Sequence, residues 1–160
     1  MVTTTNFIGD TLYVASALPA TNDAAGFEAL TWVKVEGIQQ LPQLGVTHAN
    51  NDVPDLQTGF TTGIKGAGTG VESQITCREV VSDTGQANLR TLGDDAQGEG
   101  SVKIGTGTGA NQALQNPDVV EYAQGYFHSF QKNQGNDTNH RGFTVTFHQN
   151  ALGVTGVEPV

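Results

Sequence analysis

The stretch HANNDVPDLQTGFTTGIKGAGTG, residues 48–70, is too long and too polar for an ordinary connection inside a compact domain. Connections between elements usually take about 2–6 residues, and structureless ones beyond about 12–15 are uncommon. Large apolar side chains are few in it and stand several residues apart, at Val53, Leu56, Phe60 and Ile64. The segment therefore predicts a projecting loop or hairpin arm, over about residues 46–70, that is held by something outside its own domain.

Segments with period-two alternation lie on both sides of this arm. Before it, residues 11–18 and 32–38 alternate apolar with polar side chains, as strands with one dry face do. After it, residues 71–78 place Ile75 and Cys77 on one face, opposite polar and charged side chains. The arm is therefore expected to be bracketed by strands.

One helix is predicted after these strands. Asp83 can cap it, and Gln86 stands three residues later, as in a capping box. Apolar side chains then recur at helical spacing on one face, at Leu89, Leu92 and Ala96. A short amphipathic helix over about residues 84–96 should therefore pack on the sheet.

The second half of the chain predicts a hairpin that closes the sheet. Residues 118–132 carry apolar side chains on both faces of an extended run, so both faces should contact something apolar over part of the length. Residues 141–148 place three apolar side chains on one face, at Phe143, Val145 and Phe147. The tail, residues 149–160, is either a last short strand or a peptide that docks on a neighbour.

Composition agrees with a mainly β chain that forms one domain over residues 1–160. Its 21 glycines suit many turns, because glycine reaches positive φ without strain. The formal charge of −9 opposes non-specific binding to phosphate backbones. The single cysteine, Cys77, allows no disulfide within the chain. We expect neither a secretion signal nor a membrane helix, because no long apolar run occurs.

The nominal catalytic and cofactor motifs are weak. Residues 105–110, GTGTGA, have the spacing of a dinucleotide-binding turn, but Pro117 interrupts the next segment and the crossover helix is missing. The four histidines lack the spacing of a zinc helix and Cys77 stands alone, which favours surface histidines over a metal site. Asp94 and Asp95 are explained by a solvated turn. We therefore expect no enzyme, and no catalytic, cofactor-binding or metal-ligating residues.

The order of elements resembles that of the major tail tube proteins of long-tailed bacteriophages. The matching parts are the strand TLYV, a small-residue loop, the strand TWVKVEGI, the long polar arm, a further strand, one short helix and a closing run that ends RGFTVTF. The resemblance is one of layout and spans roughly residues 7–153. It implies a small β-sandwich or barrel with one short flanking α-helix and a projecting arm.

The same resemblance implies a structural virion protein that forms hexameric rings stacked as the hollow tail tube, the conduit for DNA ejection into the host. The implied partners are further copies of itself, the tape-measure and other tail proteins, and DNA that passes through the lumen without specific binding. Assembly in the host cytoplasm and residence in the virion tail are implied, with no membrane and no cofactor.

In this family the arm reaches the adjacent ring, which implies an inter-ring contact surface on this chain. The residues that the resemblance assigns to that surface are Asn50, Asn51, Asp52, Val53, Asp55, Leu56, Phe60, Thr61, Ile64 and Lys65. An alternative stays open. An acidic β-sandwich with Gly-rich loops is also compatible with a carbohydrate- or receptor-binding module or a virion decoration protein.

Overall fold

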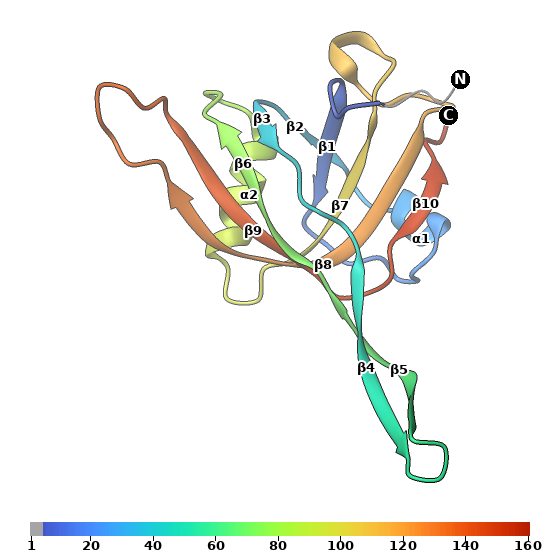
Figure 1. Cartoon of the computed structure of the whole chain (residues 1–160). Helices are drawn as coiled ribbons and strands as arrows, with labels where there is room; N and C mark the ends of the chain where they lie inside the picture. The colour runs from blue at the N-terminus through green and yellow to red at the C-terminus, as the bar shows by residue number, and fades with distance from the viewer. Residues whose placement is uncertain (1–4) are drawn as a thin grey trace.

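The computed structural model describes residues 5–160 and is mainly β, as predicted (Figure 1). Two α-helices accompany the strands, α1 (Ala24–Glu28) and α2 (Thr84–Asp94), with one 3₁₀ turn at Ala110–Gln112. The strands are β1 (Asp10–Ala15), β2 (Val33–Val35), β3 (Ile38–Gln40), β4 (Val46–Asp55), β5 (Phe60–Gly70), β6 (Glu72–Arg78), β7 (Glu99–Thr106), β8 (Val119–Lys132), β9 (Gly142–Gln149) and β10 (Val154–Val157).

All strands of the main sheet pair antiparallel, in the order β2-β1-β7-β8-β9-β6-β3. The long strand β8 is the centre of this sheet. One of its edges pairs with β7, and its other edge pairs first with β10 and further along with β9. The sheet curls around β8 (Figure 1), so that its two halves face each other across a core, as in a small β-sandwich.

The main core lies between these two halves and α2. Phe127 of β8 and Phe147 of β9 are almost fully buried, with ring centroids 4.9 Å apart. Leu89 and Leu92 of α2 pack on this core, as the helical spacing predicts. The other buried members of this core, from strands on both sides of the sheet, are Leu12, Val14, Val35, Ile75, Cys77, Val102, Ala123, Phe143 and Val145.

A second core on the opposite face of β8 confirms the two-sided pattern predicted for residues 118–132. There Tyr122 stacks on Phe27 of α1, with ring centroids 5.0 Å apart and planes 8° apart. Val120 and Leu114 complete this smaller cluster. Because α1 covers it, the short helix is as much a part of the fold as α2.

Two local predictions are wrong. The segment before Phe27 was expected to be a loop but begins α1, because the Asp23 carboxylate accepts a hydrogen bond from the Gly26 amide and caps the turn. The strand expected over 32–38 is two strands, because the chain turns at Gly37, whose φ is +72°. A Cβ at Gly37 would lie 2.7 Å from the Arg78 carbonyl, so the turn needs glycine.

The predicted helix is shorter than expected. It ends at Asp94, which leaves Ala96 exposed beyond it instead of on the apolar face. Asp83 caps the helix as predicted, by accepting from the Gln86 amide at 2.9 Å. The Gln86 side chain does not close a capping box; it donates to the carbonyls of Glu36 and Arg78 and accepts from the Val80 amide, joining three segments.

The tail contributes one strand to the main sheet. Val154–Val157 form β10 and pair with residues 119–122 of β8, which favours the first of the two readings of residues 149–160. A buried ion pair holds the end of this tail. Lys103 of β7 is 3% exposed and lies 2.9 Å from both carboxylate oxygens of Glu158.

Candidate assembly interface

The arm is a regular antiparallel hairpin, not an irregular loop. Strands β4 and β5 pair from Val46 with Gly70 out to Asp55 with Phe60, with one irregularity between His48 and Asn50. The hairpin forms its own two-stranded sheet and projects away from the main sheet (Figure 1). Its longer strand has 11 residues, which corresponds to roughly 35 Å of extended chain.

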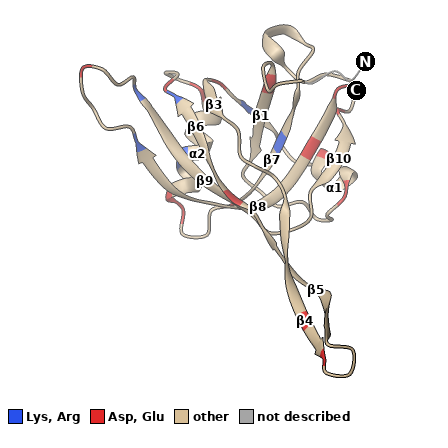
Figure 2. Ribbon diagram, viewed as in Figure 1, with Lys and Arg blue, Asp and Glu red and all other residues tan. Residues whose placement is uncertain are grey.

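The tip of the arm is a tight turn organised by Asp55. Its carboxylate accepts from the Thr58 hydroxyl and from the Gln57 amide, each at 2.8 Å. These hydrogen bonds hold the pKa of Asp55 below its ordinary value. Gly59 follows at φ +69°, which suits a residue without Cβ. Figure 2 shows acidic residues on β4 close to this turn.

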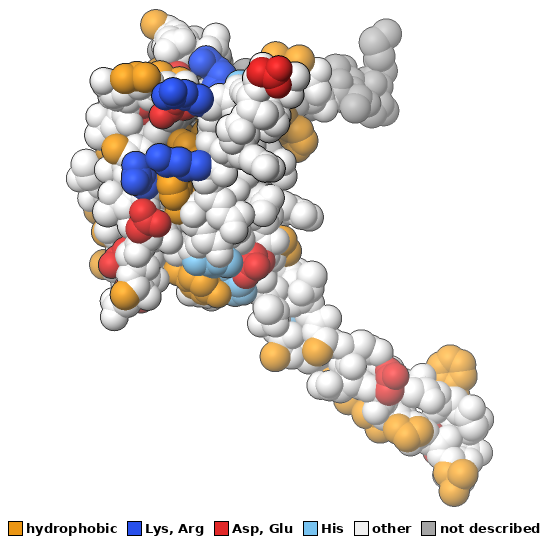
Figure 3. Space-filling model, turned by 90° about the vertical axis from the view of Figure 1, so that its left-hand side faces the viewer, with side chains coloured by type: hydrophobic (Ala, Val, Ile, Leu, Met, Phe, Trp, Pro, Cys, Tyr) orange, Lys and Arg blue, Asp and Glu red, His pale blue; other side chains and the backbone are white. Residues whose placement is uncertain are grey.

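The two faces of the arm differ. Directly opposite residues of an antiparallel pair share a face, and successive pairs alternate between faces. The pairs of Asp55 with Phe60, Val53 with Thr62 and Asn51 with Ile64 therefore share one face. We call Val53, Phe60 and Ile64 the apolar arm face; these side chains are 47%, 74% and 54% exposed. Figure 3 shows apolar side chains along the arm and at its tip.

The other face is polar. Its pairs are Pro54 with Thr61, Asp52 with Gly63 and Asn50 with Lys65. Leu56 belongs to neither face, because it stands in the tip turn, where it is fully exposed. All ten residues assigned to the contact surface are thus on the hairpin and exposed: Asn50, Asn51, Asp52, Val53, Asp55, Leu56, Phe60, Thr61, Ile64 and Lys65.

The root of the arm is held by Gln149, a residue that sequence reasoning missed. Its side chain is 1% exposed, accepts from the Gly45 amide at 2.9 Å and donates to the Ala151 carbonyl at 2.7 Å. Its backbone amide donates to the Val71 carbonyl. A Cβ at Gly70 would lie 1.7 Å from the Gln149 carbonyl, so the root leaves no room for a side chain there. A polar residue at a strand end gave no signal of this role.

Two histidines on the adjacent strands β8 and β9 come together near that root. His148 stacks on Tyr126 with ring centroids 5.0 Å apart, and His128 lies 5.7 Å from the same ring. His128 Nε2 lies 3.3 Å from the Glu72 carboxylate. In residues 5–160, no group of three or more His, Cys, Asp or Glu side chains has the geometry to hold a metal ion.

The other groups considered from the sequence lie as follows. The Cys77 thiol is fully buried in the main core, and burial raises its pKa to about 12. Asp94 and Asp95 are exposed at the end of α2. Residues 105–110 run from the end of β7 into the 3₁₀ turn, in a sheet whose pairs are all antiparallel. Across the described part of the chain, no helix combines the length and hydropathy needed to cross a bilayer.

Comparison with known proteins gives the fold a context. No protein-family model and no curated protein matches the sequence. A chain of the anti-feeding prophage baseplate superposes with a TM-score of 0.67 over 99% of this chain and 100% of that one, at 10% identity. The SPP1 tail tube gives a TM-score of 0.63 over 95% of this chain and 78% of that one, at 12% identity. The chain has the tail tube fold.

A third similar structure extends the same conclusion. The sheath/tube terminator of PVC, an extracellular contractile injection system in the extended state, gives a TM-score of 0.66 over 98% of this chain and 99% of that one, at 8% identity. The resemblance to tail tube proteins expected from the sequence layout is thereby confirmed for the fold. Within this tail tube fold, the projecting hairpin offers an exposed surface for contact with another subunit, and the root holds that hairpin on the main sheet.

Proposed function

We propose that this chain is a structural subunit that assembles into hexameric rings stacked as the hollow tail tube of a phage. The observation that carries the proposal is the apolar arm face: Val53, Phe60 and Ile64 project on a hairpin that its own domain does not cover. An isolated two-stranded hairpin is at best marginally stable in water. A neighbouring subunit in the next ring supplies the surface that the arm lacks.

The energetics of such a contact depend on a few anchors. Burying one Phe or Leu side chain contributes roughly 1.5–3 kcal/mol. Phe60 and the tip residue Leu56 are the most exposed large apolar side chains of the arm. Interfaces commonly derive most of their binding energy from a few such residues surrounded by polar contacts. Repetition of the contact around a ring multiplies this gain, so modest individual contacts suffice.

The acidity of the chain has a role in this proposal. Six copies at −9 each bring −54 to a ring. Carboxylates that face the lumen repel phosphate, so DNA slides through the tube without binding to its wall. The subunit acts as a conduit for DNA ejection and encloses the tape-measure protein before that. It performs no catalysis, has its place in the virion tail, and is assembled in the host cytoplasm.

Electron microscopy of the purified protein at high concentration tests this function. Rings or tubes about one domain thick are the expected result. The alternative functions, a carbohydrate- or receptor-binding module and a virion decoration protein, lead to a different outcome. A species that stays monomeric under all conditions, including after addition of tail initiator proteins, contradicts the tube proposal.

Replacing the arm tests the origin of stacking. A variant with Asn51 to Lys65 replaced by a short Gly-Ser turn should keep a folded subunit, because the cores lie elsewhere, but should form no tubes. A matched pair of point variants refines this. Phe60→Ser should raise the critical concentration for assembly at least about tenfold, whereas Thr61→Ser on the polar face should change it little. Unchanged tube formation after replacement of the arm would refute its role.

A second candidate arises from the structural comparisons. The PVC terminator belongs to an extracellular contractile injection system, whereas the SPP1 protein forms a tail tube. The same subunit could build the tube of such a machine, which would not deliver a phage genome. Nuclease-protected DNA in particles purified from producing cells distinguishes the two: its presence supports the phage tail, and its absence supports the injection machine.

A further inference from the structure

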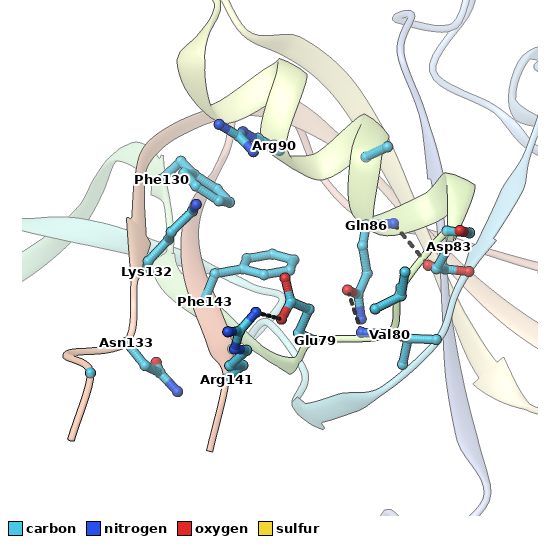
Figure 4. Close-up of a pocket in the computed structure, with 15 residues that line it drawn as sticks. Glu79, Val80, Asp83, Gln86, Arg90, Phe130, Lys132, Asn133, Arg141 and Phe143 are labelled. Atoms are coloured by element: carbon cyan, nitrogen blue, oxygen red, sulfur yellow. Dashed lines mark hydrogen bonds and ion pairs between the residues drawn. The ribbon is translucent and has the colours of Figure 1, made fainter. Parts of the chain in front are cut away.

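A groove lies between α2 and the ends of β8 and β9, with a volume of about 530 Å³ (Figure 4). Its floor is apolar, because Phe130 and Phe143 lie there with ring centroids 5.1 Å apart. The Arg90 guanidinium lies 5.4 Å from the centre of the Phe130 ring. Cavities of roughly 300–1,000 Å³ accommodate a small ligand, so this volume has room for one or two side chains of a partner.

Cations surround this groove in a chain that is otherwise acidic. Three of its seven Lys and Arg residues line it: Arg90 on α2, Lys132 at the end of β8 and Arg141 just before β9. Figure 2 shows Lys and Arg at the ends of these two strands, and Figure 3 shows them gathered on one face.

Two carboxylates also line the groove, Glu79 and Asp83, so its three lining cations exceed them by one. Glu79 lies 3.9 Å from Arg141, whose side chain is 91% exposed, so this ion pair is weak and screened. Asp83 accepts from the backbone amides of Gln86 and Glu36. Arg90 lies 3.9 Å from Asp94 one turn along α2, with both side chains 59% exposed. The groove therefore keeps a positive rim around an apolar floor.

The groove and the arm root lie at opposite ends of one ladder. Strands β6 and β9 pair from Glu72 with His148 to Arg78 with Gly142. Beyond one end, the Gln149 amide donates to the Val71 carbonyl at the arm root. Beyond the other end, the Glu79 amide donates to the Arg141 carbonyl at the groove. The seven residues of β6 separate the two by roughly 20 Å.

The arm tip matches the groove in charge and polarity. Residues 51–64 include two carboxylates, Asp52 and Asp55, and no Lys or Arg. The same segment exposes Leu56 and Phe60. We infer that the arm tip of one copy binds in the groove of a second copy, with its aromatic and aliphatic side chains on the apolar floor and its carboxylates against the cationic rim. This inference rests on the proposed stacking of subunits and names the surface that receives the arm.

The two surfaces are different and lie on opposite ends of the subunit, so the contact is head-to-tail. A head-to-tail contact does not close on itself unless its rotation forms a ring, and otherwise it propagates as an open stack. Each copy then offers a free arm at one end of the stack and a free groove at the other. Addition of subunits can continue without a change of interface.

Charge reversal of the rim tests the contact. The double variant Lys132→Glu with Arg141→Glu places like charges opposite the tip, which should raise the critical concentration for tube assembly at least about tenfold while the subunit stays folded. Adding Asp52→Lys should restore part of the loss. Adding Glu28→Lys instead changes the net charge by the same amount on the exposed side of α1, and should restore nothing.

Disulfide trapping tests the geometry directly. A chain with Gln57→Cys at the tip and Ala87→Cys at the groove should give a ladder of covalent multimers when tubes are oxidised. The chain with Gln57→Cys and Ser16→Cys should give none. The native thiol of Cys77 is buried and does not interfere.

The outcomes separate this inference from the proposed function. Tubes that form normally from the double rim variant, or that give no cross-links between positions 57 and 87, overturn the groove as the receiving surface and leave the stacking proposal standing. Failure of the unaltered chain to form tubes or rings overturns both. Loss of assembly in the rim variant with rescue by Asp52→Lys alone supports the groove.

Discussion

The arm and the β8–β9 hairpin are two long antiparallel hairpins of the same chain, but the side chains of β8–β9 are largely buried and those of the arm are exposed. In β8–β9, Phe127 faces Phe147 in register and both are buried. In the arm, Asp55 faces Phe60 in an equally regular pair, and both are exposed. Backbone pairing therefore gives both hairpins their shape. Only the β8–β9 hairpin packs its side chains against cores of its own subunit.

Because of this difference, residues of the β8–β9 hairpin stabilise the subunit, whereas residues of the arm are available for association. The side chains of β8–β9 hold the subunit together, so changes there should unfold it. The side chains of the arm contact nothing large in their own subunit, so changes there should alter only association. The glycines of β5, such as Gly63 and Gly66, add to this contrast, because they contribute no side chain to packing.

The largest effect is expected from truncating a core phenylalanine. Phe147→Ala should lower the free energy of unfolding by roughly 3–5 kcal/mol, because it removes a fully buried ring and leaves a cavity. Phe60→Ala should change it by less than about 0.5 kcal/mol in the unassembled subunit. Urea denaturation measures both. Equal losses would mean that the arm is part of the cooperative core, and the contrast between the hairpins would fail.

A smaller effect is expected at Gln149, where the two hairpins meet. Gln149→Leu leaves the Gly45 amide and the Ala151 carbonyl without their partner, which should cost roughly 1–3 kcal/mol. Amide hydrogen exchange at Gly45 should accelerate with it. Gln57→Leu at the exposed tip makes the same chemical change and should be nearly neutral. If both variants behave alike, Gln149 does not anchor the arm.

The smallest effect is expected from pH at the tip. The hydrogen bonds to Asp55 lower its pKa when the turn is formed, so their stabilisation is complete above the ordinary value of 3.8 and is lost as pH falls through the lowered pKa. Amide exchange of Gln57, or its NMR shift, should report loosening of the turn below that pH. Asp55→Asn should remove this pH dependence, and an unaltered profile would show that another group controls the turn.

Local patterns predicted the elements whose side chains have one clear environment. Alternation in 141–148 predicted β9, and the Asp83 cap with Leu89 and Leu92 predicted α2. The arm was predicted because residues 48–70 are too long and too polar for an ordinary connection, and its exposure followed from this composition. The sequence left open whether the arm is a loop or a hairpin, because Gly- and Thr-rich residues with one irregular pair give no strong period.

The errors occurred where a distant partner decides the local structure. The helix α1 has a local cap at Asp23, but the contact that buries it is the stacking of Phe27 on Tyr122, far along the chain. Residues 32–38 divide because β2 pairs with β1 at one margin of the sheet while β3 pairs with β6 at the other. Ser129, at φ +57°, lies within the irregular β8–β9 pairing between His128 and Gln131, next to Phe130, which packs against Phe143. Alternation alone predicts none of these contacts.

Composition and side chains close together along the chain were enough to predict a mainly β acidic domain, one capped helix and an arm with sparse apolar residues. That Val53, Phe60 and Ile64 share a face follows from the register of the folded hairpin, which local patterns do not reveal. The arm root and the groove likewise form only when segments far apart in the sequence fold together. Gln149 and Gly45 are 104 positions apart, and only the folded sheet brings their polar groups together.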